Sequence, residues 1–145
     1  MSGLVFLSFL AFFLYMQLGL FVLANNPKSS INRSFFYICC CLIIWSFGSM
    51  FMHFAYDEST LKFWERFSSF GWIFFPAFMV SFFYELRKNS SDVYKNVVKL
   101  AFLLMAGLFF IQSLLNNLLT KGYYWVGGTW YYQVNTHSVW YWLYL

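Results

Sequence analysis

Long stretches without a charged side chain are the feature that most constrains the fold of this chain. They cover residues 3–24, 34–56, 67–84 and 100–120, and charged residues lie between them. An α-helix rises 1.5 Å per residue, so about 20 apolar residues cross a hydrocarbon core of about 30 Å. Only 10% of the residues are charged, whereas soluble domains have about 25%. The sequence therefore predicts an all-α integral membrane protein.

The charged borders define the expected spans. We expect helices over about 3–24, 34–56, 66–86 and 98–120, which form an antiparallel bundle of four complete transmembrane helices. A final apolar run, 138–145, is expected to be the incomplete start of a fifth helix. Residues 1–145 are then a single multi-pass membrane domain, which we interpret as part of a longer one.

An aromatic segment follows the fourth span. Residues 123–126 and 129–132 are rich in Tyr and Trp and flank Gly127-Gly128. Two glycines between β-prone runs are typical of a small β-hairpin. An irregular aromatic loop in the membrane interface is the alternative, because Trp and Tyr concentrate there. The pattern leaves both interpretations open.

The distribution of basic residues predicts the orientation. Short loops rich in Lys and Arg stay in the cytoplasm. The loops after the first and third spans carry Lys28, Arg33, Arg87, Lys88, Lys95 and Lys99. The other loops carry Lys62, Arg66 and Lys121. We therefore expect the N-terminus and the aromatic segment to lie outside a bacterial cytoplasmic membrane.

A few polar residues inside the spans are candidates for ligand binding. Ser49 and His53 are four residues apart in the second span, and Gln112 and Asn116 are four apart in the fourth. Residues at this spacing share one face of a helix. Polar groups in hydrocarbon need partners and should face the bundle interior. They are predicted either to line a cavity for a small ligand or to hydrogen-bond between helices.

Catalytic and metal-binding chemistry finds little support in the sequence. The acidic residues lie in loops or at helix ends, and no catalytic motif is present. Cys39–Cys41 are consecutive, so their thiols point about 100° apart on a helix and are expected to be small apolar fillers. We predict no enzyme activity, no metal, no cofactor and no nucleic-acid partner. Trp45 is expected to pack inside the bundle.

Several of these residues occur in an ordered set that resembles a known family. The set comprises Asn26-Pro27, Asn32-Arg33-Ser34-Phe35, Trp45, Phe63-Trp64-Glu65-Arg66, Gly71, Pro76 and Phe82-Phe83. It resembles the N-terminal seven-transmembrane sensor region of bacterial histidine kinases and related signalling proteins, over roughly residues 10–90. Residues 91–145 fit in hydropathy and loop length. The resemblance implies seven helices that pass a signal to a cytoplasmic kinase or cyclase module, and it transfers no binding residue.

Together these features predict a membrane-embedded sensory input domain of a bacterial signal-transduction protein. Its expected partners are the lipid bilayer, an unidentified small or hydrophobic ligand, and a second copy of the chain. A small transporter or permease component, or a ligand-free membrane scaffold, is the alternative. A transporter should carry polar residues through the full membrane depth, and the inner half of these spans is almost wholly apolar.

Overall fold

The long apolar stretches form helices that lie side by side. The computed structural model describes residues 3–87, 92–116, 120–126 and 129–134. Its elements, in chain order, are α1 (Gly3–Asn25), α2 (Ser30–Met52), α3 (Glu58–Leu86), α4 (Asp92–Asn116), β1 (Thr120–Val126) and β2 (Thr129–Val134). All four helices are long and apolar enough to cross a membrane. The prediction of an all-α membrane fold with four complete spans is confirmed.

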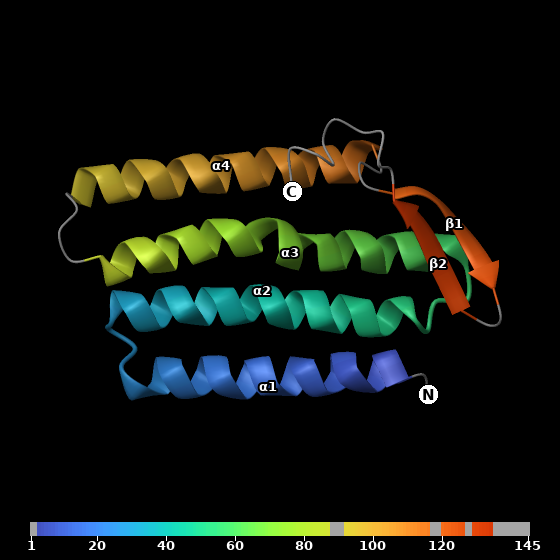
Figure 1. The fold of residues 1–145 in the computed structure, drawn as a ribbon, viewed down its shortest axis with the longest axis horizontal. Coiled ribbons are helices and arrows are strands. Elements are labelled where there is room, and N and C mark those ends of the chain that lie inside the picture. The colour runs from blue at the N-terminus through green and yellow to red at the C-terminus, as the bar shows by residue number, and fades with distance from the viewer. Residues whose placement is uncertain (1–2, 88–91, 117–119, 127–128, 135–145) are drawn as a thin grey trace.

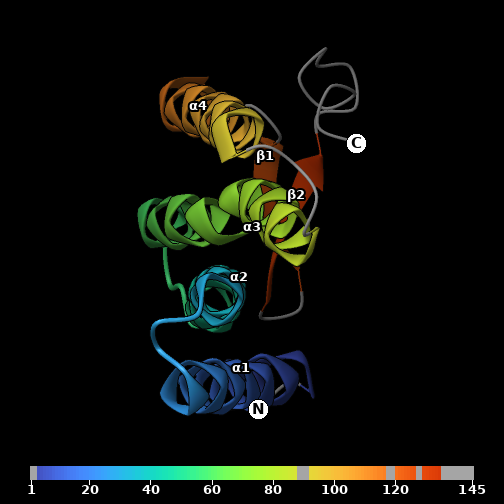
Figure 2. The same ribbon diagram turned by 90° about the vertical axis from the view of Figure 1, so that its left-hand side faces the viewer.

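The helices form one antiparallel row in chain order (Figures 1 and 2). α1 packs on α2, α2 on α3, and α3 on α4. The connection between α2 and α3 lies at the same end of the row as β1 and β2, and we call this the hairpin end (Figure 1). We call the opposite end, where α1 and α3 end, the ion-pair end, because Glu85 of α3 pairs with Lys99 of α4 there. α3 is thus an inner helix that reaches both ends.

The helix boundaries differ from the expected spans because polar caps set them. Ser29 caps α2 by accepting a hydrogen bond from the Asn32 N–H at 3.4 Å, so this helix begins before residue 34. It ends at Met52 rather than at 56, since Asp57 already caps α3. The described part of α4 ends at Asn116, and Thr120, the expected end of the span, begins β1. Hydropathy marks what lies in lipid, whereas caps decide where a helix begins and ends.

Small residues bring α2 and α3 into close contact. A Cβ on Gly71 would lie 2.4 Å from the carbonyl oxygen of Cys41, and one on Gly48 would lie 2.7 Å from the Cβ of Ser68. Cys39 and Cys41 are buried, as expected for apolar fillers. Such contacts let helix backbones pack closely in a membrane, where no hydrophobic force drives the helices together.

The same contact explains why the prediction for Trp45 is wrong. A Cβ on Gly71 would lie 2.7 Å from the Trp45 backbone nitrogen, so the two backbones nearly touch there. This leaves no room for an indole between the helices, and the Trp45 side chain is 47% exposed.

Larger side chains fill the contact between α3 and α4. Ile73, Ala77 and Ala106 are buried at its centre. Rings of Trp72, Phe74, Phe109 and Phe110 pack around them. Beyond this cluster α4 exposes most of its apolar residues, among them Leu104 and Leu108. Exposed leucines are compatible with lipid as the surrounding solvent.

The aromatic segment forms the hairpin rather than an irregular loop. β1 and β2 are antiparallel, and the pairs Tyr123–Tyr132 and Trp125–Trp130 lie opposite each other. The register shifts between Thr120 and Gly122. The expected start of a fifth helix, 138–145, lies outside the described residues.

Candidate functional site

The sequence-predicted ligand residues lie on two helices that are not neighbours. Ser49 is half-buried on α2, and His53, also half-buried, follows the last residue of that helix. Its backbone N–H donates to the carbonyl of Met50 at 3.3 Å. Gln112 is half-buried on α4. Asn116 ends α4, and its side chain lies outside what the structure describes.

α3 lies between the two pairs of candidate residues (Figures 1 and 2). The row therefore does not gather Ser49, His53 and Gln112 into one cluster. The role of all four residues in ligand binding stays a prediction.

Other polar groups do link neighbouring helices. The Ser68 hydroxyl donates to the backbone carbonyl of Trp45 at 3.4 Å and so joins α3 to α2. The Asn32 side-chain amide donates to the carbonyl of Val22 at 2.9 Å and joins α2 to α1. These two bonds match the alternative interpretation of polar residues as interhelical contacts.

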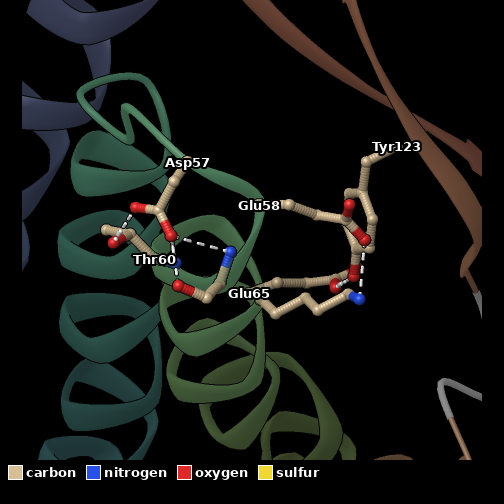
Figure 3. Close-up of polar contacts among 7 residues, drawn as sticks. Asp57, Glu58, Thr60, Glu65 and Tyr123 are labelled. Carbon is tan, nitrogen blue, oxygen red and sulfur yellow. Dashed lines mark hydrogen bonds and ion pairs between the residues drawn. The ribbon is translucent and has the colours of Figure 1, made fainter.

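The hairpin is attached to the first turns of α3 by polar contacts that the sequence analysis missed. The Tyr123 hydroxyl donates to the carboxylate of Glu65 (Figure 3). The Lys62 ammonium lies 5.6 Å from the centroid of the Tyr123 ring, within the range of a cation–π contact. Lys62 also pairs with Glu58, one turn earlier, at 2.6 Å. One tyrosine thus meets both a carboxylate and an ammonium of α3.

A second attachment comes from the other strand. The Trp130 indole N–H donates to the backbone carbonyl of Ala55 at 3.1 Å. Ala55 is buried in the connection between α2 and α3. The ring of Trp130 also packs edge-on against Trp125, with centroids 5.1 Å apart. Both strands therefore hold the hairpin on the end of the row.

The sequence did contain a signal for this site. Glu65 lies just before the uncharged run of the third span, and Tyr123 lies just after the fourth. In an antiparallel arrangement both belong to the same end. A search for tyrosine hydroxyls and carboxylates at the same end of the bundle would have identified the contact.

Asp57 fixes the start of α3 beside the hairpin. Its carboxylate accepts hydrogen bonds from the N–H groups of Ser59 at 3.1 Å and Thr60 at 3.2 Å (Figure 3). The hydroxyls of the same two residues donate to it as well. These bonds, with the Ser59 hydroxyl contributing most, lower the pKa of the Asp57 carboxyl. The cap is therefore charged at neutral pH.

An ion pair joins α3 to α4 at the opposite end of the row. The Lys99 ammonium contacts the carboxylate of Glu85. Their side chains are only 20% and 18% exposed, respectively. The Ser30 hydroxyl, in the first turn of α2, hydrogen-bonds to the same carboxylate. Three helices meet at Glu85, and this cluster gives the ion-pair end its name.

Comparison with known proteins agrees with this architecture. Residues 5–145 match the model of one protein family, the N-terminal 7TM region of histidine kinase. The chain belongs to this family. No curated protein and no solved structure matches it. The resemblance inferred from residues 10–90 is thereby confirmed and extends over nearly the whole chain.

Within this 7TM region, one helix connects the two polar clusters. α3 carries Glu58, Lys62 and Glu65 at the hairpin end and Glu85 at the ion-pair end. Among residues 3–87, 92–116, 120–126 and 129–134, no three His, Cys, Asp or Glu side chains are grouped so as to hold a metal ion. The arrangement suits mechanical linkage between the two ends of a multi-pass membrane domain.

Proposed function

We propose that this 7TM region is the sensory input domain of a bacterial signal-transduction protein. It passes an external or membrane-dissolved signal to a cytoplasmic effector and has no catalytic activity of its own. The observation that carries the proposal is the continuity of α3 between the hairpin contact at Glu65 and the ion pair at Glu85. Membership in the histidine-kinase 7TM family supports the same role.

The physical basis is that a helix moves as one body over its length. With 29 residues, α3 is about 43 Å long. A stimulus at the hairpin end acts only if it binds two arrangements of the helices with different affinity. A shift or rotation of α3 then reaches Glu85, where it changes the pairing with Lys99. Pro76, inside α3, is the position at which such a helix bends most readily.

The proposed location is the bacterial cytoplasmic membrane, with the N-terminus and the hairpin end outside. The distribution of basic residues supports this orientation. The ion-pair end carries Arg87, Lys95 and Lys99, and the hairpin end carries Lys62 and Arg66. In this orientation the hairpin receives the signal and the ion pair faces the effector.

A ligand is proposed to bind in the half of the row nearer the hairpin. Ser49 and His53 would contact it from α2, and Gln112 and Asn116 from α4. Since α3 separates the two helices, each pair would form a site of its own and would hold its own ligand molecule. Substituting one pair should then leave the affinity of the other unchanged, unlike the residues of one shared cavity.

The test breaks the link between the hairpin and α3 in the full-length protein, reconstituted in liposomes. Tyr123→Phe removes the hydroxyl that donates to Glu65 and keeps the ring above Lys62. A hydrogen bond to a charged group contributes about 1.5–3 kcal/mol. Because this bond is proposed to form in only one of the two arrangements, its loss should shift their balance by tenfold or more. The readout is autophosphorylation of the cytoplasmic module, measured with labelled ATP.

Tyr56→Phe is the matched control, because Tyr56 lies at the same end and is 85% exposed. The same hydroxyl is removed there, and output should stay at the wild-type level. Equal output from wild type, Tyr123→Phe and Glu65→Gln, with normal membrane insertion, would refute signalling through this contact.

A further inference from the structure

The first turns of α3 extend beyond the hydrocarbon core. Its uncharged part is 67–84, which covers about 27 Å and nearly fills the core. The preceding segment, 58–66, carries Glu58, Lys62, Glu65 and Arg66. Its nine residues add about 13 Å. Since charged side chains avoid the hydrocarbon, this segment lies in the headgroup layer.

The hairpin is held at this depth by its contacts. Tyr123 is bonded to Glu65 within that segment, and Trp130 is bonded to Ala55 just before it. In Figure 1 both strands overlap the beginning of α3, and the far end of β1 reaches just past it. The hairpin therefore lies beside the headgroups and does not extend far into water.

One part of the hairpin exposes apolar and aromatic side chains at that depth. Tyr124 is 50% exposed, Trp125 52% and Val126 56%. Phe54 and Phe63, from the connection before α3 and from its first turns, are also exposed at this end. Trp and Tyr are enriched at the boundary between headgroups and acyl chains, where the ring is in an apolar environment and its polar group is hydrated.

We propose that Tyr124 and Val126, which point to the same face of β1, form a contact surface for the membrane interface. The partner is the boundary between phospholipid headgroups and acyl chains at the hairpin end. The exposed residues at the same end support this choice of partner, because Phe54 and Phe63 also expose apolar rings there. The contact couples the hairpin, and through Tyr123 also α3, to the lipid around the protein.

The test is photo-crosslinking in proteoliposomes of phosphatidylethanolamine and phosphatidylglycerol. Val126 is replaced by p-benzoylphenylalanine, and adducts are identified by mass spectrometry after irradiation. The same probe at Leu104, an exposed residue in the middle of α4, defines the yield of a lipid-facing position. The probe at Ile73, buried between α3 and α4, defines the background.

Phospholipid adducts at Val126 with a yield near that of Leu104, and several-fold above that of Ile73, are the expected result. Adducts only with the protein chain would show that another part of the protein covers this surface, and the proposal would fail. A lipid yield at the background level, with no adduct of either kind, would place the surface in water and would overturn it too. If the Val126 variant does not insert, the same probe at Tyr124 tests the same face.

Discussion

Gly71 is the position at which α3 comes closest to the backbone of α2. A Cβ there would lie 2.4 Å from the Cys41 carbonyl oxygen and 2.7 Å from the Trp45 nitrogen. Both atoms are backbone, so no side-chain rotation can relieve the overlap. Gly71→Ala must therefore separate the two helices by about 1 Å to restore ordinary contact distances. The Ser68 hydrogen bond to Trp45 lies beside this contact and would lengthen as well.

The magnitude follows from two opposing effects. Replacing glycine by alanine inside a helix gains up to about 1 kcal/mol, while overpacking a tight contact costs about 1–3 kcal/mol. Loss of the Ser68 bond adds about 0.6 kcal/mol. Gly107 on α4 is the matched control, because a Cβ there meets nothing within 4 Å and only the gain applies.

We expect Gly71→Ala to have a free energy of unfolding about 2–4 kcal/mol lower than Gly107→Ala. The assay is unfolding of the detergent-solubilised protein by increasing dodecyl sulfate, followed by circular dichroism. Equal stability of the two variants would refute the close approach of α2 and α3 at this residue. A Gly71→Ser variant that is as unstable as Gly71→Ala would agree with it, since serine has the same Cβ.

Three further predictions concern the ends of the row. Glu85→Lys and Lys99→Glu should each destabilise the protein by about 2 kcal/mol in the same unfolding assay, because each leaves two like charges in a partly shielded position. The double exchange restores opposite charges and should recover most of the lost stability. A double variant that is no more stable than the single variants would contradict the pairing. The lowered pKa of Asp57 means that its charged carboxylate stabilises the folded state. This stabilisation is fully present above the pKa of an unfolded aspartate, about 3.9. It is lost as the pH falls through the lower pKa of the folded state. Thermal unfolding of the wild type should therefore show this acid-side loss, whereas Asp57→Asn should lack that component; identical pH profiles would exclude a role for the cap. A reporter fused at Asn89 should be active in the cytoplasm and one fused at Gly128 outside it, and the reverse pattern would invert the proposed orientation.

The sequence predicted the spans well because bilayer energetics act on local composition. A run such as 100–120 has no charge, and that alone marks it as apolar enough to cross a membrane. The helix ends were less predictable, since Ser29 and Asp57 set them through single hydrogen bonds to backbone N–H groups. The hairpin was also predictable as one of two outcomes, because β-prone aromatic residues flank two glycines.

The site was harder to predict because helix order is not visible in periodicity. Ser49 and Gln112 have the spacing and depth of residues that share a cavity, yet α3 lies between their helices. The order of helices depends on which faces fit, and here Gly48 and Gly71 let α3 pack directly on α2. A stripe of polar residues indicates which face of its own helix is polar. A shared site also requires that two such helices be neighbours.

The two contacts of α3 differ in a way that bears on movement. On α2 it packs with backbone against backbone at Gly71, where even a methyl group has no space. On α4 it packs through rings such as Phe74 and Phe110, with centroids 6.0 Å apart, and through one ion pair at the end. Rings and long charged side chains have alternative rotamers, but touching backbones have none. A change in packing is therefore easier between α3 and α4 than between α2 and α3, so we expect α2 and α3 to move together. The hairpin is attached to α3 at Glu65 and to the connection between α2 and α3 at Ala55. Under the proposed function, displacement of the hairpin would then have its largest effect at the Glu85–Lys99 pair, at the end of the more adaptable contact.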